Sequence, residues 1–283
     1  MASSNARNVQ AVSFGAAAAE YERGRPSYPF EAVEWVLPHD ARQVLDLGAG
    51  TGQLTRQLVE RGLDVVAVEP SAGMRKELSR RLPHVSVLDG RAEDVPLTPG
   101  AVDTVLVAQA WHWVDVERAG PEIARVLRPG GNLGLLWNIR DEREDWVAQL
   151  GRLMHQGIEL DMNSESPDVG GKFAPIVRAD FLWEHVLTPA ALMDLVASRS
   201  YVITLAGDAR ASLLRRVREL LDSHPAVRGR DEIALPYITR CSRTRRMGNA
   251  NDDPQSSAGA RFPYAPPEKM RGDAGDKRYG PTA

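Results

Sequence analysis

Two acids and a run of glycines are spaced so that a parallel α/β sheet would bring them together around a nucleotide. The segment Asp46-Leu47-Gly48-Ala49-Gly50-Thr51-Gly52 follows an apolar run, and Glu69 ends the next apolar run, 21 residues beyond Gly48. Glycine permits a tight turn and lets a ligand approach main-chain N–H groups that a Cβ would screen. A carboxylate at the end of the second strand can accept hydrogen bonds from both hydroxyls of a ribose. The spacing therefore predicts a nucleoside-binding site.

The details of the turn indicate which adenosine compound suits it. A dinucleotide-binding turn spaces its glycines G-x-G-x-x-G and leaves the helix N-terminus bare for a pyrophosphate. Here the glycines stand at alternate positions, and Asp46 precedes them. A carboxylate at that position repels a pyrophosphate and attracts a cation. S-adenosylmethionine (SAM) carries an ammonium and a sulfonium and has no phosphate, so it fits better than NAD or FAD.

The segment from Asp46 to Gly52 resembles the first motif of the class I SAM-dependent methyltransferases, which is of D/E-x-G-x-G-x-G type. The resemblance implies a doubly wound, Rossmann-like α/β fold with a seven-stranded sheet of order 3-2-1-4-5-7-6. It also implies SAM as the cofactor. The residues of the first two motifs that would bind it are Asp46, Gly48, Ala49, Gly50, Gly52 and Glu69.

The adenine would lie beside the second and third strands. In the resemblance, Pro70 and Met74 flank the base, while the backbone near Ala92 and the side chain of Glu93 meet its edge. Plainer interpretations stay open: Glu69 as an ordinary acid at a strand end, Met74 as a core residue of its helix, and the segment around Glu93 as a solvated acidic loop.

The fourth strand is predicted to end in Ala108-Gln109-Ala110-Trp111-His112-Trp113, near the point where the strand order reverses and ligands bind. Gln109 is expected to contact the cofactor, and Trp111 and Trp113 to stack on the acceptor or face the sulfonium. Histidine is the side chain whose unperturbed pKa lies nearest neutrality, so His112 could remove a proton from the acceptor. Packing remains the alternative for the indoles, and substrate orientation or a bond to a loop carbonyl for the histidine.

The N-terminal segment from Phe14 to Pro29 resembles the F…Y-x-x-x-R-P-x-Y-P entry of small-molecule enzymes similar to trans-aconitate methyltransferase. In such enzymes it forms a lid over SAM, and the resemblance implies that Tyr21 and Arg25 reach the methionine carboxylate. A helix that simply docks on the core is the alternative. The [ND]-P-P-[YF] sequence of nucleic-acid amino-methyltransferases does not follow the fourth strand.

Alternating apolar runs and helix-period segments predict the elements that position these residues. Helical spacing of apolar residues indicates helices around 54–59 and 123–127. Further helices are expected over 145–160, over 208–221 and from residue 189, where Thr188 is the N-cap. The predicted strands are Gln43–Leu47, Asp64–Val68, Val85–Leu88, Val102–Val107, Asn132–Trp137, Phe181–Leu187 and Glu232–Cys241.

Composition limits the remaining possibilities. The chain has 283 residues, 43% of them apolar, a formal net charge of −3 and one cysteine, Cys241. We expect a metal-independent protein of the cytoplasm without a membrane span, a broad nucleic-acid surface, a disulfide or a cysteine-rich zinc site.

The expected organisation is a lid at 1–28, the methyltransferase domain at 29–241 and a disordered tail at 242–283. The tail is expected to be disordered because no Val, Leu, Ile or Trp follows Ile238. Oligomeric state is not predictable.

The leading hypothesis is methyl transfer from SAM to an oxygen, a carboxylate or hydroxyl, of a small molecule. A SAM-binding protein without turnover is the second hypothesis, because binding residues alone do not prove transfer. An NAD-dependent oxidoreductase is the third, and Asp46 together with the lack of a Tyr-x-x-x-Lys arrangement argues against it.

Overall fold

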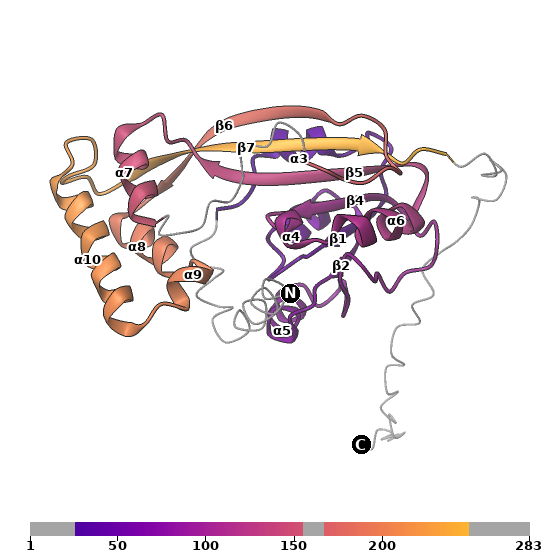
Figure 1. Ribbon diagram of the computed structural model, residues 1–283, viewed down its shortest axis with the longest axis horizontal. Helices are drawn as coiled ribbons and strands as arrows, with labels where there is room; N and C mark the ends of the chain where they lie inside the picture. Colours follow the sequence, from indigo (N-terminus) through magenta and orange to yellow (C-terminus); the bar gives the residue numbers. More distant parts are fainter. Residues whose placement is uncertain (1–25, 155–166, 249–283) are drawn as a thin grey trace, which may run out of the picture.

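The computed structural model describes residues 26–154 and 167–248. They form a seven-stranded sheet of order β3-β2-β1-β4-β5-β7-β6, which confirms the predicted fold class (Figure 1). The strands are β1 (Gln43–Leu47), β2 (Asp64–Val68), β3 (Ser86–Leu88), β4 (Val102–Ala108), β5 (Leu127–Arg140), β6 (Val177–Leu187) and β7 (Ile233–Arg245). The helices are α3 (Phe30–Val36), α4 (Gln53–Glu60), α5 (Ala72–Arg81), the 3₁₀ helix η1 (Trp111–Trp113), α6 (Val116–Val126), α7 (Asp145–Met154), α8 (Pro189–Ala197), α9 (Ser200–Ile203) and α10 (Gly207–Ser223).

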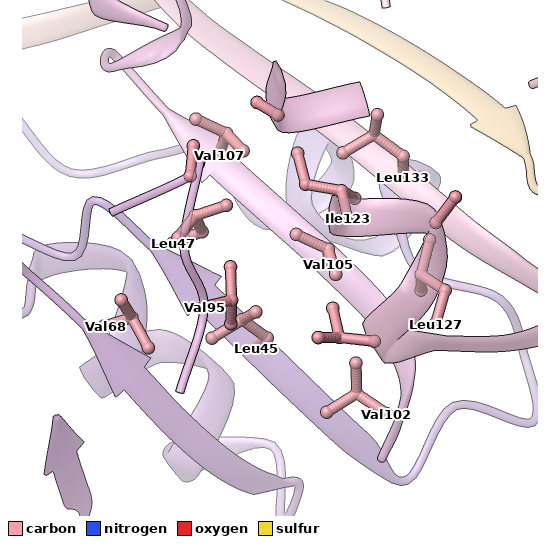
Figure 2. Close-up of a cluster of buried hydrophobic side chains, with 14 of the residues drawn as sticks. Leu45, Leu47, Val68, Val95, Val102, Val105, Val107, Ile123, Leu127 and Leu133 are labelled. Atoms are coloured by element: carbon pink, nitrogen blue, oxygen red, sulfur yellow. The ribbon is translucent and has the colours of Figure 1, made fainter. Parts of the chain in front are cut away.

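The parallel half of the sheet forms from continuous apolar runs. Strands β1 and β2 have the predicted bounds, and Leu45 pairs with Val66 on one side and Val105 on the other. A strand buried on both faces needs apolar residues at every position, which explains why these runs do not alternate. Figure 2 shows the packed side chains on one face, where Leu45, Val105 and Ile123 meet. This rigid layer sets the positions of the loops at the strand ends.

The antiparallel part, β5-β7-β6, extends further than predicted. Strand β7 continues to Arg245. The sequence analysis placed the start of a disordered tail at residue 242, and this boundary is wrong because residues 242–245 belong to the strand. Ser242 and Thr244 are buried polar residues held in the ladder, and the Thr244 hydroxyl donates to the carbonyl of Ala174 at 2.6 Å. Ladder hydrogen bonds thus order a stretch that lacks large apolar residues.

Helices α7 to α10 gather at one end of the long strands β5, β6 and β7 (Figure 1). Helices α7, α8 and α10 pack around a second core that includes Leu150, Leu192 and Val217, together with Tyr237 of β7. Helix α8 begins as predicted, since the Thr188 hydroxyl accepts the amide of Ala191 at 3.1 Å. We call α7–α10 the helical cap. The part of the predicted helix beyond Met154 lies outside the described residues, and none of the described helices is long and apolar enough to cross a membrane.

We predict that removing residues 249–283 leaves the melting temperature nearly unchanged, because their composition is too poor in apolar residues to offset the ordering entropy. Removing everything from Ser242 should lower it by several degrees, because the last four residues of β7 then leave the sheet. Thermal unfolding of the two truncated proteins and the full chain checks this. A large loss on removing 249–283 alone would show that the tail stabilises the domain.

Candidate active site

The glycine turn connects β1 to α4 and has the backbone shape that only glycine adopts readily. Gly48 has a φ of +73°, and a Cβ on it would lie 2.9 Å from the Cβ of Ala110. Gly52 has a φ of +91°, and its Cβ would lie 3.0 Å from Leu78. At Gly50 the nearest atom to such a Cβ is the Sδ of Met74, at 3.9 Å. The turn is therefore closely packed at its two ends and open at its centre, as a ligand cradle requires.

Glu69, which follows β2, is hydrogen-bonded to this turn. Its Oε2 accepts the amide of Gly50 at 2.9 Å, and its Oε1 accepts the amide of Ser71 at 2.8 Å. The side chain is buried, and that burial raises its pKa above the ordinary value although both amides oppose the shift. A carboxylate has about four acceptor positions, so two remain for further donors. This arrangement fits the two hydroxyls of a ribose.

Asp46 lies at the end of β1 and is 1% exposed. Its Oδ2 accepts the hydroxyl of Thr55 at 2.6 Å. Burial raises the pKa of this carboxyl to about 7, and the neighbouring charge of Glu69 adds to the increase, while the bond from Thr55 opposes it. A buried carboxylate is stabilised by an adjacent cation. The site thus fits the ammonium-bearing end of SAM.

A cavity opens beside the turn and crosses the carboxyl ends of the parallel strands. Gln109, just after β4, has a φ of +59°, an unusual conformation for a residue with a side chain. Its Nε2 donates to the carbonyl of Asn138 at 3.1 Å, which fixes the side chain between β4 and β5. The lining residues are Pro26, Tyr28, Asp46, Gly48, Ala49, Gly50, Thr51, Gln53, Leu54, Ala108, Gln109, Asn138, Arg199 and Tyr237.

The residues predicted to contact the adenine lie around the ends of β2 and β3. Met74 and Ala92 are buried, whereas Pro70 is exposed, as expected for a residue that covers one face of a base. Glu93 is partly buried, and its Oε1 accepts the amide of Asp115 at 2.8 Å. That bond secures the loop before α6 and leaves its other oxygen for a ligand. The adenine contacts remain predictions.

The aromatic segment after β4 does not line the cavity. Trp111 is 5% exposed, belongs to the first core and donates Nε1–H to the carbonyl of Asp168 at 2.9 Å. Its burial supports the packing alternative over the predicted stacking role. Trp113 is 40% exposed, and His112 is exposed with its ring 4.7 Å from that of Trp113. Neither belongs to the described cavity lining, so their substrate and catalytic roles remain predictions.

Tyr21 and Arg25, predicted to reach the methionine carboxylate, lie outside the described residues. The narrower resemblance to trans-aconitate methyltransferases depends largely on the same segment and stays a prediction. Conversely, the sequence analysis missed Thr55, Asn138, Arg199 and Tyr237. Of these, only the burial of Tyr237 could have been predicted from the sequence. Every second residue of its strand faces the same side, and that side is formed by Leu235, Tyr237, Thr239 and Cys241.

The sheet order, the glycine turn and the two buried acids define an α/β fold built to bind a nucleoside with a cationic appendage. A methyltransferase domain model matches residues 45–135. An uncharacterized methyltransferase of Mycobacterium tuberculosis is 54% identical, with 84% of this chain and 97% of the relative covered. An uncharacterized methyltransferase-like protein of Schizosaccharomyces pombe is 29% identical, covering 83% of this chain and 95% of the relative.

Solved structures agree with the fold. A methyltransferase structure from Anaeromyxobacter dehalogenans is similar with a TM-score of 0.56 and 25% identity, covering 78% of this chain and 97% of the other. The chain belongs to the class I SAM-dependent methyltransferases, and SAM is its cofactor.

Proposed function

We propose that this enzyme transfers the methyl group of SAM to an oxygen, a carboxylate or a hydroxyl, of a small molecule. The observation that carries the proposal is the cavity, whose lining begins at Asp46 and the glycine turn and continues past Gln109 to polar side chains on β5 and β7. An acceptor bound there would lie next to the cofactor and away from bulk water. Alignment and desolvation of this kind account for much of the rate of a direct displacement.

The residues of the chain have separate tasks in this proposal. Glu69 binds the ribose, and Asp46 holds the ammonium-bearing end of the cofactor. When bound, SAM supplies an electrophilic methyl group with a neutral thioether as the leaving group. The strained Gln109 keeps its side chain at the junction of the cofactor and acceptor ends, because its Nε2 is anchored on Asn138.

A small acceptor is favoured over a nucleic acid by the sequence at the end of β4. Enzymes that methylate base amines hold the flipped base with an [ND]-P-P-[YF] segment, and this chain has Ala108-Gln109-Ala110-Trp111 there. The formal charge of −3 also offers no general attraction for a phosphate backbone. We therefore propose a metabolite-sized acceptor.

An acceptor screen with SAM labelled on its methyl group tests the proposal. The purified full-length chain is incubated with small carboxylic acids, alcohols, phenols and amines in separate pools, and the formation of S-adenosylhomocysteine is measured. We expect acceptor-dependent turnover in a pool of oxygen acceptors. Transfer to amines alone would overturn the oxygen assignment. Tight SAM binding with no transfer in any pool would favour the binding protein without turnover.

We also predict that His112→Ala separates two kinds of acceptor. With an alcohol or phenol, proton removal contributes to the barrier, so a base at His112 predicts a loss of turnover of about 10²–10⁴-fold at unchanged SAM affinity. With a carboxylate no base is needed, and the change should act mainly on KM. Steady-state turnover of both proteins checks this, with Glu117→Gln, an exposed position on α6, as the control. Equal turnover of an alcohol would show that His112 is not the base.

A further inference from the structure

The hydroxyl of Tyr237 is buried without a hydrogen-bond partner in the part of the chain that the structure describes. The residue is 1% exposed, and it is one of those that line the cavity. A buried hydroxyl without a hydrogen-bond partner destabilises the folded protein, and a bound ligand can supply the missing partner. A phenylalanine would fill the same space without that cost. The hydroxyl is therefore well explained by a ligand that accepts its hydrogen bond.

Packing holds the ring of Tyr237 in place before any ligand binds. The ring stacks on Trp183 of β6, with centroids 5.3 Å apart and an interplanar angle of 23°. The Trp183 Nε1–H in turn donates to the Thr239 hydroxyl at 2.9 Å, and that hydroxyl donates to Oδ1 of Asn138 at 2.6 Å. These hydrogen bonds link β6, β7 and β5, and they end at Asn138, which also lines the cavity. A preorganised donor loses little entropy when a ligand binds.

Arg199 brings a positive charge to the same cavity from the helical cap. It follows Ser198, the C-cap of α8. Two hydrogen bonds fix its backbone: its N–H donates to the carbonyl of Val196, and its carbonyl accepts from the N–H of Val202. Among the described residues that line the cavity, it is the one with a cationic side chain. The guanidinium of Arg199 only donates hydrogen bonds and repels a cation, and the Tyr237 hydroxyl can donate a hydrogen bond to an oxygen. Together they favour an oxygen anion.

The methionine carboxylate of SAM is one source of such an anion, and sheet geometry argues against it. Strand β7 is three strand intervals from β1, roughly 14 Å at about 4.8 Å each. The ring of Tyr237 packs on Trp183 of β6, on the far side of β7 from β1. The carboxylate of an amino acid lies only about 3 Å from its amine, by standard bond lengths. Strand spacing therefore favours an anion other than the carboxylate of an amine held at Asp46, and the SAM affinity of variants at Tyr237 and Arg199 decides between the two sources.

We infer that Tyr237 and Arg199 form the anchoring site for a carboxylate of the methyl acceptor, so that the substrate is a small organic acid. The inference rests on the proposed function and names its substrate class. The acid is held at the cap end of the cavity by two donors, and the rest of the molecule extends towards Gln109 and the glycine turn. Any oxygen of that molecule nearer the turn can receive the methyl group.

Binding to the protein saturated with S-adenosylhomocysteine tests this site without requiring turnover. The probes are glutarate, citrate and benzoate, each compared by calorimetry with the matched neutral amide. We expect at least one acid to bind and its amide not to bind. Tyr237→Phe should weaken that acid about 3–30-fold, and Arg199→Gln should weaken it more, since a charged donor is lost. The control Arg228→Gln changes an exposed arginine outside the cavity lining and should have no effect.

Two further readouts separate a ligand role from a structural role. The affinity for SAM should stay within about twofold in both variants, and Tyr237→Phe should melt no lower than the parent because it removes an unsatisfied hydroxyl. Lower SAM affinity in Arg199→Gln, matching its loss of acid binding, would assign the residue to the cofactor's carboxylate and overturn the inference. Failure of every acid to bind would overturn it too. The proposed function would survive both results if neutral oxygen acceptors are methylated in the screen.

Discussion

Replacing Asp46 with asparagine is expected to stabilise the ligand-free protein above pH 7 and to weaken SAM binding. Burial raises the pKa of this carboxyl from 3.8 to about 7, so its ionised form is less favourable in the folded state than in the unfolded state. The unfolded chain releases this proton near pH 4 and the folded protein near pH 7, so the ionisation costs stability progressively as pH rises between these values. The full cost above pH 7 is roughly 2–4 kcal/mol.

Asparagine removes that cost and keeps an oxygen for the Thr55 hydroxyl. Denaturant unfolding should therefore show a larger stabilisation of Asp46→Asn at pH 8 than at pH 5. SAM affinity should fall about 10–100-fold, because an ammonium loses its charged acceptor. Asp64→Asn, an exposed position on the neighbouring strand, is the control and should change neither quantity. Equal stabilisation at both pH values, or unchanged SAM affinity, would contradict the role assigned to Asp46.

Replacing Glu69 with alanine is expected to weaken SAM binding by roughly 1–3 kcal/mol, or about 5–150-fold. Two ribose hydroxyls lose their charged acceptor, and the amides of Gly50 and Ser71 lose theirs. Glu69→Gln should also bind weakly, because its NH₂ group would face one of those two N–H donors. Calorimetry with S-adenosylhomocysteine measures the effect.

Two comparisons make the Glu69 result specific. Glu60→Ala removes an exposed carboxylate from α4 and should leave the affinity unchanged. Melting temperatures of the ligand-free variants show whether the turn has lost its shape. A well-folded Glu69→Ala protein that binds as tightly as the parent would refute the ribose placement.

The sequence was sufficient for the parts of the fold that depend on local patterns. Strands β1 and β2 were predicted with correct bounds because each is a continuous apolar run next to a glycine turn or an acid. The spacing of Asp46 and Glu69 similarly predicted that both lie at the same sheet edge, and the structure brings Glu69 to the amide of Gly50. Parallel strands have only one edge at which their carboxyl ends meet.

Long-range pairing was not predictable in the same way. Strands β5 and β7 are longer than expected. They pair with each other from Asn132 opposite Arg245 to Arg140 opposite Tyr237, and this ladder orders residues of low apolar content. Local composition does not reveal a partner strand about a hundred residues away. The same limit explains why 242–245 was wrongly assigned to the tail.

The end of the cavity next to the helical cap depends on contacts between distant segments. Tyr237 and Arg199 meet at the cavity because β7 inserts between β5 and β6 while the cap places the end of α8 beside it. At Trp111 the sequence showed an aromatic side chain after a strand, yet its direction is set by the Asp168 carbonyl, 57 residues away. Motifs predicted the glycine turn and the position of Glu69 beside it, whereas packing between distant segments defines the other end of the cavity.

Calorimetric titration of the purified parent chain with SAM, and separately with NAD, tests most directly that the glycine turn and its two acids form a SAM site. The account predicts saturable binding of SAM at one site per chain, competition by S-adenosylhomocysteine and no heat of binding with NAD. Binding of NAD in place of SAM, or SAM binding that persists unchanged when Asp46 and Glu69 are both replaced, would contradict it.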